Sequence, residues 1–313
     1  MSSASPITIT RREVGSTIWF DRALADQAPS AATYELLPEI LDSEEAVGLA
    51  MLEELESLGQ ATSGDLVIIL LGGRGAQAFH RLLGERAMAG DPDGLIARLH
   101  VYTQDALAPM RMDNSFSFVR DFERLLGPDF FRRVKSFKPM LTDVQDLDAA
   151  LVTYADELEA LGGIDIFFLG HGPEPNNNSH LAYIRSGSGA SAQSVAGMIP
   201  ISPLLLEHHI TKFKAGGTQV NAADEAECRR ANWILTLGPA VILESRRIVQ
   251  SVVDAETAPA KRESYRRVME TEIAGNTAER AAQLDENPGL WIRLHPNVRS
   301  LILPDVLSSR VVQ

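Results

Sequence analysis

The sequence predicts an α/β fold in one domain over residues 1–313: a doubly wound, mostly parallel sheet with helices on both faces. Two observations predict it. Apolar runs at residues 66–71, 99–103, 164–169 and 233–237 have the length and composition of buried strands. Helical patterns lie between these runs, and an alternation of strand and helix places parallel strands side by side through right-handed connections.

The composition is that of a globular protein with an acidic surface. With 313 residues, 45% of them hydrophobic, the chain can bury a substantial core. The net charge of −13, without a dense group of Lys and Arg, argues against nucleic acid or an anionic membrane as a partner. No apolar run is long enough to span a membrane, and the first residues lack the apolar core of a signal peptide.

Cysteine usage fits the same class of protein. Cys228 is the only cysteine, which excludes an intramolecular disulfide and a cysteine-based zinc cluster. A single cysteine suits a reducing compartment, so we expect a cytoplasmic protein. Glu207, His208 and His209 stand together, but adjacent side chains point apart on a helix, and we expect no metal site.

Capping patterns place three of the helices. Asp42 and Glu45 form a capping box before a helix that ends near Gly59. Another helix is expected to begin at Asn114, and a third to cover residues 142–161.

The flanking and later segments are predicted as follows. Residues 8–10 are expected to form a short strand, residues 195–201 and 300–303 further strands, and residues 203–209 a helix. Residues 254–287 are charged and Ala-rich, and they predict a helical insertion before the last strand. A lid, a dimer element and an ornament are three alternatives for this insertion, so a homo-oligomer is one of the expectations.

A glycine-rich turn follows the first strong strand. It contains Gly72, Gly73, Arg74 and Gly75, and a helix is expected to start near Ala76. Glycine lets the backbone approach a ligand closely, and a helix N-terminus presents free N–H groups, so this arrangement can hold a phosphate. Many such turns use glycine for geometry alone. Arg74 either supplies charge to a phosphate or lies on the surface.

A second glycine-rich segment follows the strand at residues 164–169. It contains Gly170 and Gly172, and a polar loop with Glu174 and His180 comes after it. Open α/β sheets bind ligands at the carboxyl ends of their strands. The alternative is a surface loop in which Asn side chains make turns.

Taken in order, these motifs resemble the glucosamine-6-phosphate isomerase/deaminase and 6-phosphogluconolactonase superfamily. The resemblance covers roughly residues 65–305. It implies an enzyme of carbohydrate metabolism that isomerises, deaminates or hydrolyses a phosphorylated sugar, without a cofactor or a metal. The motifs that carry it are Gly72-Gly73, Gln104-Asp105, Gly170-x-Gly172, His180, Gly217-Thr218, Leu237-Gly238 and Leu294-His295-Pro296.

The resemblance also implies roles for individual residues. Asp105 or Glu174 is the candidate proton-transfer base, and His180 is the candidate group for opening the sugar ring. Lys212 or Lys214 can reach an anion. The candidate substrate-binding residues are Gly72, Gly73, Arg74, Gly75, Gln104, Gly170, Gly172, Asn178, Arg185 and Lys214.

The chain differs from the family at the positions where the family has catalytic acidic residues. The family's first acid falls on Gln104, which cannot take a proton, and Asp105 falls on the second acid. The loop before His180 is longer than the family's. Counting forward from Gly172 puts the family's Asp on Glu174, and counting back from His180 puts it on Asn178.

Two further family positions differ in charge. Arg185 stands where the isomerase branch has a Glu, and Val241 stands where the family has a phosphate-binding Lys. Loss of the expected acids leaves a second hypothesis open, a sugar-phosphate-binding or sensor protein that has lost catalysis. A third is a structural α/β protein without a ligand.

Overall fold

The computed structural model describes residues 8–23, 32–256 and 258–307, and its centre is a parallel sheet. The sheet has seven strands in the order β3-β14-β13-β8-β4-β5-β7. Each neighbouring pair is parallel, which confirms the predicted doubly wound α/β fold. The strands are β3 (Pro38–Ile40), β14 (Val298–Ile302), β13 (Ile248–Val252), β8 (Ile166–Gly170), β4 (Leu66–Leu70), β5 (Leu99–Thr103) and β7 (Ser136–Lys138).

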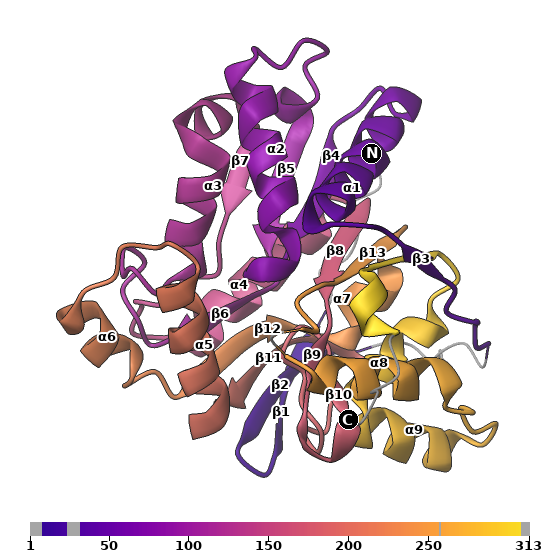
Figure 1. Ribbon diagram of the computed structural model, residues 1–313. Helices are drawn as coiled ribbons and strands as arrows, with labels where there is room; N and C mark the ends of the chain where they lie inside the picture. Colours follow the sequence, from indigo (N-terminus) through magenta and orange to yellow (C-terminus); the bar gives the residue numbers. More distant parts are fainter. Residues whose placement is uncertain (1–7, 24–31, 257, 308–313) are drawn as a thin grey trace, which may run out of the picture.

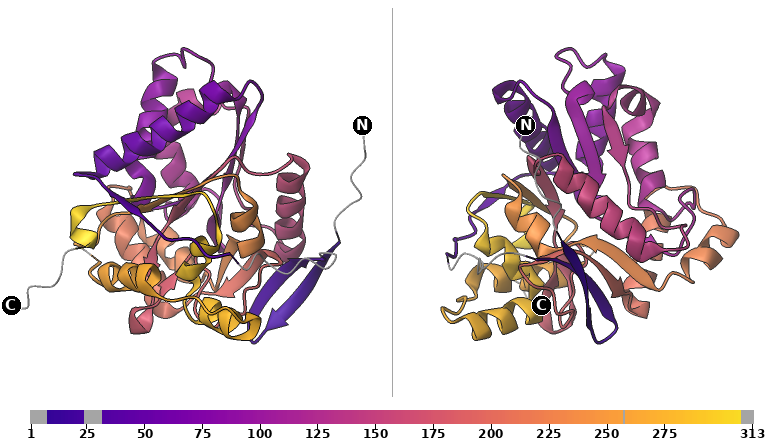
Figure 2. Two further views of the ribbon diagram at one scale, coloured as in Figure 1. Left: turned by 90° about the vertical axis from the view of Figure 1, so that its right-hand side faces the viewer. Right: turned by 180° about the vertical axis from the view of Figure 1, so that it is seen from behind.

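Helices cover both faces of this sheet, as Figures 1 and 2 show. In β4, Leu66, Ile68 and Leu70 pack in the cluster that contains α1, α2 and α3, while Val67 and Ile69 pack in the cluster that contains α4. Burial on both faces explains why the strand is a continuous apolar run. None of the described helices is long and apolar enough to cross a membrane. The helices are α1 (Glu44–Ala61), α2 (Gln77–Met88), α3 (Phe118–Arg133), α4 (Leu147–Ala160), α7 (Pro239–Glu244), α8 (Ala260–Glu270) and α9 (Thr277–Glu286).

A second, antiparallel sheet stands beside the first, and the sequence did not predict it. Its order is β1-β2-β11-β12-β6. The predicted strands at residues 8–10, 195–201 and 233–237 are strands, but they belong to this sheet. The strands are β1 (Ile9–Val14), β2 (Thr17–Arg22), β11 (Ser194–Pro200), β12 (Trp233–Leu237) and β6 (Asp105–Ala108).

The two sheets meet at Gln104. Its N–H donates to the carbonyl of Leu70 at the end of β4, at 3.0 Å, and its carbonyl accepts from the N–H of Leu237 in β12, at 3.0 Å. The chain leaves the parallel sheet at Thr103 and enters the antiparallel one at Asp105. The Gln104-Asp105 pair therefore lies at the seam between the sheets.

Several predicted helix ends were wrong because nearby side chains cap better. α1 is capped by Ser43, whose hydroxyl accepts from an amide in the first turn, and not by Asp42. The Asn114 side chain accepts from the N–H of Phe116 at 2.9 Å, so it makes a turn, and α3 starts only after Ser117. α4 is capped by Asp146. α5 (Pro203–Ala215) and α1 run beyond their predicted ends.

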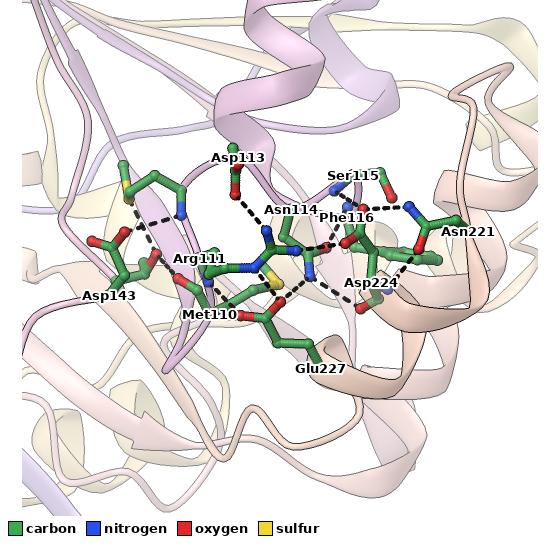
Figure 3. Close-up of polar contacts among 12 residues, drawn as sticks. Met110, Arg111, Asp113, Asn114, Ser115, Phe116, Asp143, Asn221, Asp224 and Glu227 are labelled. Atoms are coloured by element: carbon green, nitrogen blue, oxygen red, sulfur yellow. Dashed lines mark hydrogen bonds and ion pairs between the residues drawn. The ribbon is translucent and has the colours of Figure 1, made fainter.

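The loop before α3 is held by a polar network on α6 (Ala222–Cys228), drawn in Figure 3. Arg111 donates to Asp224 at 2.7 Å and to Glu227 at 2.9 Å. The Asn114 amide donates to Glu227 at 3.0 Å, and the Ser115 N–H donates to Asp224 at 3.1 Å. This network fixes the start of α3.

The predicted insertion is helical and packs on the loop that follows β8 (Figure 1). The amide oxygen of Asn287 accepts from the N–H of Ser179 at 2.8 Å, and Arg267 donates to the carbonyl of Asn176 at 3.0 Å. The hydroxyl of Ser264 lies 2.8 Å from Nε2 of His171. The insertion is therefore built into the support of this loop.

Candidate functional site

The chain changes direction in the parallel sheet between β4 and β8. From β4 it continues through α2 to β5 on one side, and after β8 it returns to β13 on the other side. Open α/β sheets bind ligands outside the carboxyl ends of the strands at such a switch point. The two glycine-rich segments, residues 72–75 and 170–172, follow these two strands.

The turn after β4 requires glycine at two positions. A Cβ on Gly72 would lie 2.3 Å from the ring of Phe118, and Gly73 has a φ of +79°. Outside helices and strands, none of the described backbone hydrogen bonds is donated by the amides of these two residues. The Gly75 carbonyl accepts from the hydroxyl of Ser251 in β13, at 2.7 Å. Arg74 reaches Glu44 of α1 at 2.7 Å, on the surface.

The Gln104-Asp105 pair is buried at the end of β5. Gln104 is 5% exposed and Asp105 is 2% exposed, and the Gln104 amide donates to Oδ2 of Asp105 at 2.5 Å. Burial raises the pKa of Asp105 to about 7, although the bond from Gln104 acts to lower it. Oε1 of Gln104 and Oδ1 of Asp105 are buried without a hydrogen-bond partner.

The structure settles how the long loop before His180 is arranged. Its extra residues form a tight turn, η3 (Pro175–Asn177), in which Asn176 has a φ of +62°. The Glu174 N–H donates to the Asn178 carbonyl at 2.8 Å, so both candidate positions flank the base of one turn. The Glu174 carboxylate lies 3.6 Å from Nε of Arg185. Burial raises the pKa of Glu174, and Arg185 acts to lower it.

His180 lies in a two-stranded ribbon of β9 (Gly172–Pro173) and β10 (Ser179–His180), paired with Gly172. A Cβ on Gly172 would lie 1.8 Å from Nε2 of His180, so the imidazole rests on the glycine backbone. The ring stacks on Tyr183, with centroids 4.9 Å apart. Burial lowers the pKa of His180 to about 3, and the charges of Lys261, His208 and Arg185 act in the same direction.

A left-handed turn holds Tyr183 in place. Ala182 has a φ of +48° and Tyr183 of +58°. The carbonyl of Ala182 accepts from the hydroxyl of Thr236, which is paired with Asp105 between β12 and β6. The charge of Asp105 adds to the burial that raises the pKa of Tyr183. His180 is thus connected to the Gln104-Asp105 pair through Tyr183 and Thr236.

The two candidate cations, Lys212 and Lys214, have different partners in the structure. Lys214 is exposed and pairs with Glu225 at 2.7 Å, away from the loop. Lys212 pairs with Asp254 at 3.0 Å, at the end of β13, and Lys261 of α8 pairs with the same carboxylate. Sequence reasoning missed Lys261, because the sequence analysis assigned no site residue to the segment 254–287, and Lys261 lies on α8 within it.

The packing around Val241 and His209 is as follows. Val241 is 7% exposed and lines a pocket with Arg22 of β2 and Glu159 of α4, so α7 brings no cation to the glycine turn. His209 is buried with Nε2 2.8 Å from the Phe116 carbonyl. Among the described residues, no group of three His, Cys, Asp or Glu is arranged to hold a metal ion.

Sequence reasoning also overlooked Tyr183 and His171, although both stand close to Gly172 and His180 in the sequence. Tyr183 stacks on His180. His171 precedes Gly172, the residue paired with His180, and its Nε2 lies 2.8 Å from the hydroxyl of Ser264. An aromatic residue three positions after His180 was the available signal for Tyr183.

Buried polar atoms without hydrogen bonds gather around this switch point. Buried polar groups are nearly always hydrogen-bonded in native proteins, so a group of such atoms indicates a place where water or a ligand supplies the partners. The atoms are Oε1 of Gln104, Oδ1 of Asp105, Nδ1 of His171, Oδ1 of Asn178 and Nδ1 of His180.

No protein-family model and no curated protein sequence matches this chain. Solved structures do match. A monomeric glucosamine-6-phosphate deaminase is 18% identical over 87% of this chain and 98% of its own, with a TM-score of 0.64. The chain therefore shares the fold of this deaminase. This confirms the fold that the resemblance in the sequence implied.

Structures of lactonases in the same superfamily extend the match. The 6-phosphogluconolactonase from Trypanosoma cruzi is 14% identical over 89% of this chain and 98% of its own, with a TM-score of 0.61. The enzyme from Trypanosoma brucei is 15% identical over 88% and 98%, with a TM-score of 0.58. The deaminase/lactonase fold thus accounts for most of the chain.

Proposed function

We propose that this chain binds a phosphorylated sugar at the switch point between β4 and β8 and hydrolyses its lactone. The observation that carries the proposal is the set of buried polar atoms without hydrogen bonds on Gln104, Asp105, His171, Asn178 and His180, which belong to the segments that follow the strands of the parallel sheet. Proteins with this fold include a glucosamine-6-phosphate deaminase and 6-phosphogluconolactonases, which supports a sugar phosphate as the class of ligand.

Hydrolysis is favoured over isomerisation by the bases available. Moving a proton between two sugar carbons needs a positioned base, and the first acid position holds Gln104, an amide. The neighbouring carboxyl of Asp105 is buried and already accepts from Gln104. The imidazole of His180 is neutral at physiological pH because its pKa is lowered to about 3, so it can accept a proton.

Lactone hydrolysis needs one proton to move twice. As water attacks the carbonyl carbon, the neutral imidazole of His180 takes a proton from it, and a tetrahedral oxyanion forms. When the ring C–O bond breaks, the imidazolium returns this proton to the departing ring oxygen. Stacking on Tyr183 and contact with Gly172 hold the imidazole in one orientation through both transfers.

The lowered pKa of His180 also favours a second candidate, a sugar-phosphate-binding protein without turnover. An imidazole with a pKa of about 3 is a weak base, since general bases work best when their pKa lies near the operating pH. A bound phosphate would offset the nearby cations and raise this pKa. Turnover of a lactone by the wild-type protein separates the two candidates.

The first expected result is stabilisation by phosphorylated sugars. A ligand present at about 100 times its dissociation constant adds roughly 2.7 kcal/mol to the free energy of unfolding. We expect 6-phosphogluconate and glucose 6-phosphate to raise the melting temperature, and gluconate and glucose to leave it unchanged. If no phosphorylated sugar shifts the melting temperature, the proposal fails.

A second expected result concerns deamination. With Gln104 in place of the base, ammonia release from glucosamine 6-phosphate should remain below about 1 per second, a low turnover for an enzyme. Hydrolysis of 6-phosphogluconolactone, followed above its spontaneous rate, should be measurable in the same preparation. Rapid ammonia release would mean that Asp105 or Glu174 serves as a carbon-acid base after all.

A further inference from the structure

Two lysines from different elements share one buried carboxylate at the end of β13. Asp254 is 6% exposed, and its Oδ2 accepts from Lys212 Nζ at 3.0 Å. Its Oδ1 accepts from Nζ of Lys261, whose side chain is 15% exposed. Although burial acts to raise it, the two lysines lower the pKa of Asp254, so the carboxylate is ionised. The Lys212–Asp254–Lys261 cluster therefore carries a net charge of about +1.

This cluster lies beside the glycine turn. β13 and β8 are neighbours in the sheet, and Ser251, three residues before Asp254, donates to the Gly75 carbonyl at 2.7 Å. The pKa of Arg74 is raised chiefly by its hydrogen bond to Glu44 and in smaller part by the charge of Asp254. The end of β13 and the glycine turn thus belong to the same edge of the site.

The charges of the cluster also act on the histidines of the site. After burial, the charge of Lys261 is the largest cause that lowers the pKa of both His171 and His180. The pKa of His208, on α5, is lowered by burial and then by Lys212 and Lys261. Lys261 lies one turn before Ser264 on α8, and the hydroxyl of Ser264 is 2.8 Å from Nε2 of His171 in the loop that carries His180.

We infer that Lys212 and Lys261, spaced by Asp254, bind the phosphate group of the sugar together with the backbone of the 72–75 turn. The inference rests on the proposed function, and it assigns part of the ligand site to α8 of the insertion. Two ammonium groups alone would repel each other, and the carboxylate keeps both charged and oriented before the ligand arrives. A phosphate dianion then offers oxygens to both ammonium groups.

The test replaces Lys261 by Met, which keeps the length of the side chain and removes its charge. Titration calorimetry should show that Lys261→Met weakens binding of 6-phosphogluconate by about 10-fold or more, the effect of losing one charged hydrogen bond. Binding of gluconate should not change. Lys135→Met is the matched control, because Lys135 pairs with Asp65 at the amino ends of β7 and β4, the opposite edge of the sheet, and this variant should bind like the wild type.

Asp254→Asn tests whether the carboxylate between the two lysines is needed for phosphate binding. Asp254 has a φ of +60°, a conformation that Asn tolerates, so the backbone should be retained. Removing the carboxylate that orients the two lysines should weaken 6-phosphogluconate binding, because the two ammonium groups then repel each other without a counter-charge between them. Unchanged binding by a folded Asp254→Asn would show that the carboxylate does not organise the lysines and would overturn the inference.

The outcomes separate this inference from the proposed function. If the wild type binds no phosphorylated sugar, the proposed function fails, and the inference fails with it. If the wild type binds 6-phosphogluconate and a folded Lys261→Met binds it equally well, only the inference fails. An equal loss for 6-phosphogluconate and gluconate assigns Lys261 a structural role and also overturns it. Circular dichroism and urea unfolding establish that each variant is folded.

Discussion

Replacing His180 by Asn is expected to lower turnover of 6-phosphogluconolactone by about 100-fold or more while the affinity for 6-phosphogluconate changes little. Asn keeps a hydrogen-bonding group beside Gly172 and Tyr183 but cannot accept the proton of the attacking water. The measurement is the initial rate of lactone hydrolysis per folded molecule, corrected for the spontaneous reaction, together with titration calorimetry.

A matched control exists on β5. His100 lies within 2.7 Å of the Ser136 hydroxyl and 3.8 Å from Asp65, both far from the loop that carries His180. His100→Asn should therefore leave turnover unchanged. If His180→Asn hydrolyses the lactone at the wild-type rate, His180 does not move the proton. If its stability falls and its turnover does not, His180 serves only to hold the loop.

Asp105→Asn is expected to stabilise the protein above neutral pH. In the folded protein the pKa of Asp105 is raised from 3.8 to about 7 by burial, so folding at high pH buries a charge without full compensation. A difference of about three pKa units corresponds to at most about 4 kcal/mol. Asn is neutral at every pH, and its amide oxygen can still accept from Gln104.

The stabilisation by Asp105→Asn should depend on pH, and its direction follows from the pKa of Asp105. Between pH 3.8 and about 7 the folded wild type binds more protons at Asp105 than the unfolded chain does, so this residue's contribution to stability falls as the pH rises. Urea unfolding should therefore show no advantage of Asp105→Asn near pH 4, a growing one up to about pH 7 and a constant one above.

An exposed carboxylate provides the control for this experiment. Asp65 pairs with Lys135, and this hydrogen bond lowers its pKa. Asp65→Asn should therefore give no stabilisation at pH 8. If Asp105→Asn is no more stable than the wild type at pH 8, Asp105 is charged without cost and its environment is more polar than its burial indicates.

Local sequence signals predicted the parts of the fold that depend on neighbouring residues. The strand at residues 99–103 was predicted at its observed bounds, since a short apolar run can be buried on both faces of a parallel sheet. The glycine turn was located because a close approach of Phe118 to Gly72, and a positive φ at Gly73, exclude most other residues there.

Helix ends were less well predicted. Asp42 and Ser43 both fit a cap, and the choice fell to Ser43 because its hydroxyl reaches the Ala46 amide at 3.1 Å. The sequence predicts a helix start at Asn114, but Asn114 forms a turn whose position is fixed by α6, more than a hundred residues later in the chain. Such contacts leave no local pattern.

By itself the sequence determined the α/β class and the edge of the sheet where a ligand would bind, because glycine, apolar runs and strand order act over short distances along the chain. Only the tertiary structure decided that Glu174 and Asn178 flank one turn, that Gln104 joins two sheets, and that α8 packs against the loop at His171. These relations depend on backbone pairing and side-chain contacts between segments far apart in the sequence. A single sequence does not show which distant segments come together.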